Sequence, residues 1–294
     1  MYQKFYGLHD KPFNMTPDSR FFYSSAKHEE ALNCLLLAIS ERNGFVVITG
    51  EIGSGKTTVC RTLINKLDQK TKVALILNTH LGKKELLTTI LEDLGIEYRS
   101  TSKTHLLAAL NEYLLEQASK DVNVVVIIDE AQNLAPSVLE EVRMLSNLET
   151  ETEKLLQIVL LGQPELKKKL ALPKLEQFRQ RVVFHYHLEP LSREETKEYV
   201  KHRLKKAGNE TSDIFDDEAI NEIYIHSKGV PRLINVMCHN ALITGLVYES
   251  KRVTRDIALE AIAESENGLG SPKLVKESHE DSVDEMIKKL QVSG

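Results

Sequence analysis

The sequence predicts an α/β fold in which a parallel sheet lies between layers of helices, followed by a smaller, entirely helical domain. Three observations lead to this fold class. Short apolar runs alternate with helical patterns between residues 29 and 188. These runs are almost continuously apolar, as is typical of parallel strands covered on both faces. Beyond Pro190 only helical patterns occur, so we expect an α/β domain over residues 1–190, a helical domain over 191–264 and a tail over 265–294.

The composition is that of an ordinary globular protein and excludes several classes. The chain has 294 residues, of which 41% are hydrophobic and 28% are charged, and its formal net charge is −5. A chain of negative net charge does not coat nucleic acid or anionic membranes over its whole surface. Because the sequence has no secretory leader and no run of about 18 apolar residues, we expect a cytoplasmic protein without a membrane span.

The cysteines give no sign of a disulfide framework or a zinc site. There are three, Cys34, Cys60 and Cys238, and they are far apart in the sequence. None belongs to a Cys-x-x-Cys pair or to a cysteine–histidine spacing typical of zinc binding. We therefore expect buried, reduced thiols.

The first 23 residues hold seven of the 17 aromatic residues, interleaved with Pro12 and Pro17. Such a segment is a strap and not a regular element. One interpretation is that its aromatic side chains anchor an N-terminal arm to the core, since aromatics tend to be buried. The other is that part of the strap forms a wall of a base-binding pocket.

Strands and helices then follow one another in order. A helical pattern runs from Glu29 to Ile39, and the turn signal Asn43-Gly44 precedes the first fully apolar run. The expected strands are 45–49, 73–77, 124–128, 157–161 and 182–188, and the expected helices between them are 57–67, 86–94, 106–115 and 138–148. This alternation predicts a sheet with helices on both faces.

The helical domain begins with a capping box, in which Ser192 and Glu195 open the first helix. Apolar residues at helical spacing over 219–224 indicate a second helix. A third is expected to begin at Pro231, because proline is tolerated in a first turn, and Thr254 is a suitable cap for a fourth.

The tail differs in composition from both domains. Residues 265–280 are polar, charged and rich in glycine and serine, which is typical of a flexible segment. Farther on, Val283, Met286, Ile287 and Leu290 lie at the spacing of one helix face. The end of the chain is therefore either a frayed terminus or a short amphipathic helix that docks elsewhere.

A phosphate-binding pattern, G-x-x-x-x-G-K-[ST], lies directly between a predicted strand and a predicted helix. It is formed by Gly50, Glu51, Ile52, Gly53, Ser54, Gly55, Lys56 and Thr57. Its glycines let backbone amides surround a polyphosphate, and the helix N-terminus adds a favourable dipole. We expect Lys56 to reach the β- and γ-phosphates and the Thr57 hydroxyl to bind Mg²⁺, with Thr58 also in the nucleotide site.

Two acidic residues, Asp129 and Glu130, directly follow the predicted strand 124–128. Ligands bind at this carboxyl edge in open parallel sheets. The Asp129 carboxylate suits the coordination shell of Mg²⁺, a hard cation that prefers oxygen. Glu130 is placed to orient or deprotonate an attacking water as a general base.

The motifs belong to a longer pattern, made of FYGL, KPF, TPD and FFY near the N-terminus, then GEIGSGKTT, IIDEAQNL, LLGQPEL, RQR and GVPRLIN. This pattern covers residues 1–263 and resembles the AAA+ ATPases, in particular the ATPase portion of the general secretion pathway protein A family. Relatives of that family include ATPases of pilus biogenesis and of exopolysaccharide- or exosortase-linked gene clusters. The resemblance implies a P-loop NTPase (AAA+) sheet with the helical domain as its lid.

The resemblance also implies roles for residues outside the loop. Gln163, at the end of the fourth strand, is expected to sense the γ-phosphate. Arg181, or else Arg179, is expected to reach the nucleotide of a neighbouring subunit, and Arg232 to act on its own subunit's nucleotide from the lid. Asn78 corresponds to a polar switch that holds the base off the water. Each arginine has a plainer alternative, because an exposed arginine is often only a solvated surface charge.

The implied cofactors are ATP or ADP with Mg²⁺, and the implied first partner is the protein itself, in a nucleotide-dependent homo-oligomer or ring. A protein of a secretion or cell-envelope apparatus is the implied second partner, with the chain peripheral at the inner membrane through it. In the full secretion protein a membrane span and a periplasmic peptidoglycan-binding domain follow this portion. The present sequence stops before either, so we expect a free-standing ATPase or a shortened form.

Two other function classes remain open: a nucleotide-switched DNA-binding regulator of transposition or replication, and a P-loop small-molecule kinase. Basic runs favour DNA: Lys167, Lys168, Lys169, Arg193, Lys197, Lys201, Arg203, Lys205 and Lys206. Solvated helix faces explain them better, because the net charge is negative and no helix-turn-helix is evident. Adjacent acids and the implied trans arginine argue against a kinase. His185 and His187 alternate along one strand, which is more typical of packed or exposed strand histidines than of metal ligands.

Overall fold

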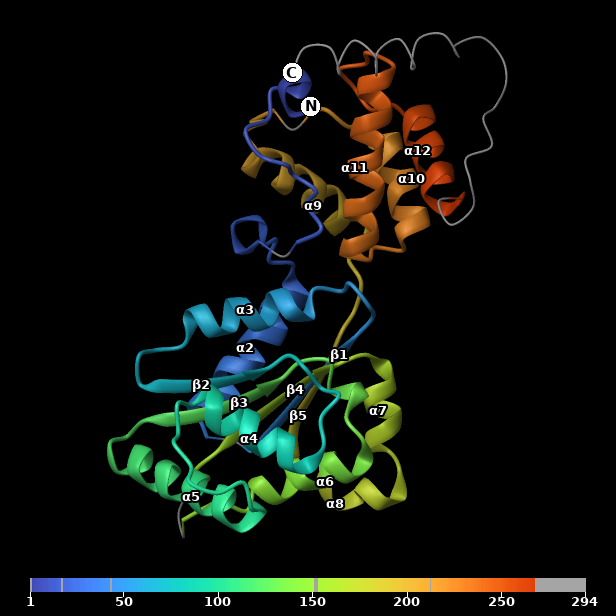
Figure 1. The fold of residues 1–294 in the computed structure, drawn as a ribbon. Helices are drawn as coiled ribbons and strands as arrows, with labels where there is room; N and C mark the ends of the chain where they lie inside the picture. The colour runs from blue at the N-terminus through green and yellow to red at the C-terminus, as the bar shows by residue number, and fades with distance from the viewer. Residues whose placement is uncertain (1, 17, 43, 151–152, 212, 268–294) are drawn as a thin grey trace.

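The structure is a computed structural model that describes residues 2–16, 18–42, 44–150, 153–211 and 213–267. It contains a parallel sheet covered on both faces by helices, and a helical domain on the side of α2 and α3 (Figure 1). The α/β fold class expected from the sequence is therefore confirmed. The expected tail helix falls outside the described residues.

The sheet has five parallel strands in the order β2-β3-β4-β1-β5. They are β1 Phe45–Gly50, β2 Thr71–Ile76, β3 Asn123–Ile128, β4 Gln157–Gly162 and β5 Val182–Leu188. Every residue of β1 and β4 is buried, whereas β5 at the sheet edge alternates between partly buried and exposed residues. Because all strands run the same way, the segments that follow β1, β3 and β4 meet at one edge.

Helices cover both faces of this sheet. They are α2 Ala26–Ser40, α3 Lys56–Lys66, α4 Lys83–Asp93, α5 Lys103–Ser119, α6 Pro136–Leu145, α7 Pro164–Leu170 and α8 Glu176–Arg179, with short 3-10 turns η1 Ser19–Phe21, η2 Ala131–Asn133 and η3 Pro173–Leu175. Apolar side chains of α2 and α3 pack on one face, and those of α4 to α8 pack on the other. The sequence did not predict α7 and α8, which are too short to show a helical period.

The helical domain has the four expected helices. They are α9 Arg193–Lys206, α10 Asp217–Ser227, α11 Pro231–Val247 and α12 Arg255–Asn267. The predicted capping box opens α9: Glu195 N donates to Ser192 Oγ over 3.1 Å, and Ser192 N donates to Glu195 Oε2 over 2.8 Å. Pro231 is the first residue of α11, as the sequence predicts.

The N-terminal arm (residues 2–16 and 18–23, including helix α1 Tyr2–Tyr6) is part of the helical domain's core. Its buried aromatics Tyr2, Tyr6, Phe13 and Phe21 belong to one apolar cluster with residues of α9 to α12. The backbone of the arm is also hydrogen-bonded to the helical domain, since His9 N donates to the Ala207 carbonyl over 2.7 Å. The sequence assigns this arm to the α/β domain of residues 1–190, yet its buried aromatics pack in the core of the helical domain.

None of the helices described is both long and apolar enough to cross a membrane. The three cysteines are free thiols, as expected; Cys60 and Cys238 are buried and Cys34 is partly exposed. Burial raises the pKa of the Cys60 thiol to about 12. This thiol therefore remains protonated at neutral pH.

Candidate functional site

The loop between β1 and α3 follows a path that only glycine can adopt at two positions. Gly53 and Gly55 have φ values of +81° and +100°, in the left-handed region. A Cβ atom on Gly53 would lie 2.5 Å from the Arg232 Cβ atom, and one on Gly55 would lie 2.8 Å from His28 Nε2. The loop therefore runs closely between the first turn of α11 and the side chain of His28.

Lys56 is folded back beneath this loop. Its Nζ atom donates to the carbonyl oxygens of Gly50 and Glu51, each over 2.8 Å, and the residue is buried. Burial lowers the pKa of Lys56, while the carboxylates of Glu130 and Asp129 oppose this shift. The ammonium group of Lys56 thus lies on the inner side of the loop. An anion bound within the loop would be stabilised by its positive charge.

Thr57 and Asp129 bring two oxygen ligands together at the start of α3. The Thr57 hydroxyl donates to Asp129 Oδ2 over 2.8 Å, and Asp129 is buried. A hydroxyl and a carboxylate oxygen fit Mg²⁺, which prefers oxygen and completes its shell with phosphate and water. The described residues contain no group of three or more His, Cys, Asp or Glu side chains that could hold a metal ion by themselves.

Glu130 occupies a left-handed backbone conformation, with φ of +52°, directly after Asp129. Its amide donates to Asp129 Oδ1 over 2.8 Å. Its carboxylate oxygen Oε2 accepts hydrogen bonds from Gln132 Nε2 at 2.5 Å and from Gln163 Nε2 at 3.1 Å. The structure therefore brings Gln163 to Glu130, at the ends of neighbouring strands β3 and β4.

Asn78 does not take the expected place beside Glu130. Its side chain is exposed, and its Oδ1 atom accepts from the His80 amide over 3.2 Å. The next residue, Thr79, is buried, and its hydroxyl donates to the Glu130 carbonyl over 3.1 Å. The strand β2 ends at Ile76, so Asn78 and Thr79 lie in the loop that follows, where the alternation of a strand no longer decides which side chain faces inward.

Two of the three candidate arginines lie far from the loop. Arg181 directly precedes β5, and its Nη1 atom donates to Ser146 Oγ over 2.6 Å. Arg179 is exposed at the end of α8. Because β5 is seven residues long, roughly 20 Å separates this end of the strand from the loop's edge of the sheet. Neither arginine can reach the phosphate loop of its own chain.

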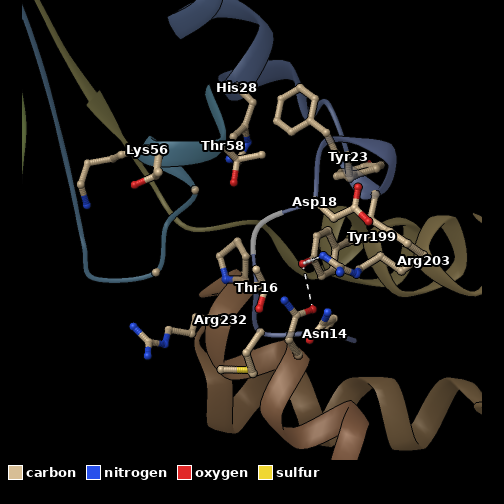
Figure 2. Close-up of a pocket in the computed structure, with 18 of the residues that line it drawn as sticks. Asn14, Thr16, Asp18, Tyr23, His28, Lys56, Thr58, Tyr199, Arg203 and Arg232 are labelled. Carbon is tan, nitrogen blue, oxygen red and sulfur yellow. Dashed lines mark hydrogen bonds between the residues drawn. The ribbon is translucent and has the colours of Figure 1, made fainter. Parts of the chain in front are cut away.

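Arg232, by contrast, lies at the loop. Its amide donates to the Gly53 carbonyl over 3.3 Å, and its exposed side chain borders the same pocket as Lys56. Figure 2 shows Lys56 and Arg232 coming from opposite sides, one from the loop and one from α11. The first turn of α11 thus joins the helical domain to the phosphate loop.

The pocket has a volume of about 320 Å³ and lies between the phosphate loop, the arm and helices α9 and α11. Its lining includes Asn14, Thr16, Asp18, Phe22, Tyr23 and Tyr199, all but Phe22 labelled in Figure 2. The structure thus confirms that aromatics of the strap anchor the arm, and it also places Phe21, Phe22 and Tyr23 in the lining of the pocket. That this pocket binds a base stays a prediction. A pocket of this size and mixed lining is typical of small-molecule sites.

His28 is a residue of the site that the sequence motifs leave unassigned. Its Nε2 atom lies 3.1 Å from the Ser54 carbonyl, which can only accept, so Nε2 carries the proton. Its Nδ1 atom then accepts from the Ser25 hydroxyl, 2.7 Å away. Burial lowers the pKa of His28. The neutral imidazole supports the phosphate loop from the N-terminus of α2.

Four of the nine residues in the basic runs, Lys169, Lys197, Lys201 and Arg203, make contacts within the described chain. Lys197 pairs with Asp217 at 2.6 Å and Lys201 lies 3.7 Å from Glu198. Arg203 is buried, and its Nε atom donates to the Pro12 carbonyl. These contacts agree with solvated or packed helix faces more than with a surface that grips DNA.

The strand histidines share one partner. His185 Nε2 and His187 Nδ1 lie 3.1 and 3.0 Å from the Thr49 hydroxyl, between strands β5 and β1. Both histidines are exposed at the edge of the sheet, so this contact is that of exposed strand histidines hydrogen-bonded to the neighbouring strand.

Comparisons with known proteins agree with this site. Residues 39–170 match the family described as AAA domain. The chain is 42% identical over 263 residues to general secretion pathway protein A of Aeromonas hydrophila, which covers 89% of this chain. It spans about half, 48%, of the length of that relative.

Solved structures share the fold at low sequence identity. The ORC2 protein of Aeropyrum pernix, in ADPNP-ADP complexes, has a TM-score of 0.66 at 16% identity and covers 90% of this chain and 72% of its own. Cdc6p of Pyrobaculum aerophilum has a TM-score of 0.64 at 20% identity, covering 87% and 75%. The RuvB branch migration motor of Thermotoga maritima has a TM-score of 0.54 at 20% identity, covering 80% and 67%. The chain belongs to the AAA+ P-loop ATPases and is a relative of general secretion pathway protein A.

Proposed function

We propose that the protein is a Mg²⁺-dependent ATP hydrolase that acts as a homo-oligomer. The observation that carries this proposal is the convergence of Lys56, Thr57 and Glu130 on one pocket. The first offers a cation to the β- and γ-phosphates, the second a metal ligand shared with Asp129, and the third a carboxylate for the attacking water. Magnesium bound there would neutralise charge on the phosphates.

The positions of Arg179 and Arg181 support an oligomer. Both lie at the amino end of β5, roughly 20 Å of strand away from the loop of their own chain. An arginine at the transferring phosphoryl group raises rates about 10³- to 10⁵-fold. Arg181, with Arg179 as the alternative, therefore acts on the nucleotide of a neighbouring copy, while Arg232 acts within its own chain.

The biological process follows from the relative in the general secretion pathway. We propose that hydrolysis drives assembly or remodelling of a secretion or cell-envelope apparatus, of the general secretion, pilus or exopolysaccharide type. A protein of that apparatus would be the partner. We place the chain in the cytoplasm, where ATP is abundant and its three free thiols stay reduced, and at the inner membrane through that partner.

The test measures phosphate release by nuclease-treated protein over a range of protein concentrations. We expect turnover per subunit to rise steeply with concentration, and to need Mg²⁺ but no acceptor other than water. Glu130→Gln should bind ATP and lose turnover, and Lys56→Ala should lose ATP binding at least tenfold. A rate per subunit that is equal at every dilution, or equal in Glu130→Gln and wild type, contradicts the proposal.

The same assay separates the other two classes. Strong stimulation by added DNA, falling steeply with salt, would favour the DNA-binding regulator. Phosphate release only in the presence of a small-molecule acceptor would favour the kinase. We expect neither, because Lys197 and Lys201 of α9 have acidic neighbours and Glu130 faces the pocket.

A further inference from the structure

The Glu130 carboxylate is held by Gln132, a side chain to which the sequence motifs give no role. Gln132 lies two residues after Glu130, in η2, and its Nε2 atom donates to Glu130 Oε2 over 2.5 Å. Gln163 Nε2 donates to the same oxygen over 3.1 Å. Both amides therefore act on one oxygen of the carboxylate.

The backbone fixes which end of the Gln132 amide faces Glu130. The Gln163 N–H group can only donate, and it donates to Gln132 Oε1 over 3.0 Å. The amide nitrogen must then point toward Glu130. A reversed amide would place the Gln132 oxygen against Glu130 Oε2, and the Gln132 NH₂ group against the N–H group of Gln163. Only the orientation with the nitrogen toward Glu130 therefore satisfies both contacts.

Two neighbours hold Gln132 in this place. A Cβ atom on Gly162 would lie 3.1 Å from Gln132 Oε1 and 2.8 Å from Leu166 Cδ2, so the glycine at the end of β4 leaves room for the amide. The Lys169 ammonium donates to the carbonyls of Gln132 and Leu134, and this fixes the backbone of η2 from α7. Gln132 thus links the ends of β3 and β4.

We propose that Gln132 is a positioning residue for ATP hydrolysis, which holds Glu130 Oε2 so that Oε1 faces the pocket. This inference rests on the proposed function. The proton of the attacking water passes to Glu130 Oε1, and the water oxygen bonds to the γ-phosphorus. The β–γ bridging oxygen leaves with the bonding pair, as part of ADP. Because Gln132 also accepts from the Gln163 backbone, a shift of Gln163 on meeting the γ-phosphate moves the Glu130 carboxylate with it.

The experiment compares Gln132→Ala and Gln132→Glu with wild type and with Gln69→Ala, a control at an exposed glutamine in the turn after α3. General-base catalysis contributes about 10²- to 10⁴-fold, so misplacing the base should lower kcat roughly 10- to 100-fold. KM for ATP should change less than about twofold, and the melting temperature should stay near that of the control.

Gln132→Glu separates positioning from packing. This variant keeps the length of the side chain and an acceptor for the Gln163 amide, but it sets an acceptor where Glu130 needs a donor. We expect its kcat to fall at least as far as that of Gln132→Ala. A kcat near wild type in Gln132→Glu, or a fall explained by KM or unfolding, overturns the positioning role.

A double-mutant cycle with Gln163→Ala supplies a second readout. Since both amides act through one oxygen, the two losses in kcat should be strongly non-additive. Fully additive losses would overturn the shared role. Suppose that wild type hydrolyses ATP, that Glu130→Gln does not, and that Gln132→Ala keeps the wild-type kcat. In that case only the proposed role of Gln132 is wrong. Wild-type turnover in Glu130→Gln would overturn the proposed function as well.

Discussion

Glu130 combines an unfavourable backbone conformation with a place at the pocket. A residue with a side chain loses about 1–2 kcal/mol in the left-handed region, where Glu130 lies at φ of +52°. Two hydrogen bonds offset this cost: its amide donates to Asp129 Oδ1, and its carbonyl accepts from Thr79 Oγ1. The turn aims the carboxylate at the two glutamines instead of along the strand direction. Such strain is typical of functional residues.

His28 gives a residue-scale prediction about pH. Burial lowers its pKa below the ordinary value of 6.5, so the unfolded chain binds the proton more readily than the folded one. The stability that neutral His28 provides is complete above pH 6.5 and is lost as pH falls through the lowered pKa. We expect the difference in free energy of unfolding between wild type and His28→Gln to shrink below pH 6.5, in urea titrations at several pH values.

The comparison with His28→Gln is needed because burial also lowers the pKa of His185, His202 and His239. A matched control is His80→Gln, at an exposed histidine. A difference between wild type and His28→Gln that is constant from pH 5 to pH 8 would contradict the assigned neutral state.

For single residues, the sequence predicted well which residue types form the site. It predicted less well the direction in which individual side chains point. The phosphate loop and Asp129–Glu130 could be placed because spacing and residue type define them. The direction of Asn78 could not be predicted, since β2 ends at Ile76 and strand alternation does not extend into the loop beyond it. Gln132 was also missed, because its reach to Glu130 depends on a left-handed backbone turn that spacing does not encode.

Among the elements, α7 fixes the turn that carries Gln132. Lys169 from its last turn donates to two carbonyls of that region, and the lysine is partly buried, which lowers its pKa. The neighbouring Lys168 is exposed. A lysine of the predicted basic run thus has an internal structural contact.

We expect Lys169→Met to lower both stability and kcat, and Lys168→Met to change neither. The methionine keeps most of the apolar stem but removes the donor, so stability should fall by about 1 kcal/mol. Urea unfolding and steady-state phosphate release measure the two effects. Equal free energies of unfolding and equal kcat values in the two variants would show that the Lys169 hydrogen bonds contribute to neither stability nor catalysis.

The arm and the helical domain give a second prediction for elements. Phe13 is buried and its ring meets the Phe215 ring edge-on, with centroids 5.9 Å apart. Replacing a buried phenylalanine with alanine costs about 3–5 kcal/mol. We expect Phe13→Ala to lower the free energy of unfolding by that amount in urea, whereas Met15→Ala, at an exposed position, should change it little. A small effect of Phe13→Ala would mean that the arm is not part of the core.

The elements themselves were largely predictable. The five strands could be found because each is an apolar run bounded by polar or turn residues. The four helices of the helical domain could be found from caps and apolar spacing. Which elements the arm covers could not be predicted, because aromatic content indicates burial and says nothing of the surface that buries it.

For the whole molecule, the separation between Arg181 and its own phosphate loop leads to a mixing experiment. Glu130→Gln subunits lack the base, and Arg181→Ala subunits lack the arginine. In a ring of equal, randomly mixed subunits, about one quarter of the sites combine an intact base with an intact neighbouring arginine. We expect phosphate release by the mixture to exceed that of either variant alone.

The matched control replaces Arg181→Ala with Lys56→Ala in the same mixture. No pair of these subunits has both the phosphate lysine and the base in one chain, so the mixture should stay inactive. A mixture of Glu130→Gln and Arg181→Ala that remains as inactive as its parts would contradict the trans role of Arg181, and the same mixture with Arg179→Ala then tests the alternative.

The packing of the arm also bears on how the chain is made in the cell. Tyr2, Tyr6, Phe13 and Phe21 find their partners on helices that the ribosome completes only after residue 190. Until then the arm has no partner helices to pack against, while the α/β domain can already fold. A ribosome that stalls before α9 would leave these aromatics in water, so we expect the nascent protein to expose apolar surface during that interval.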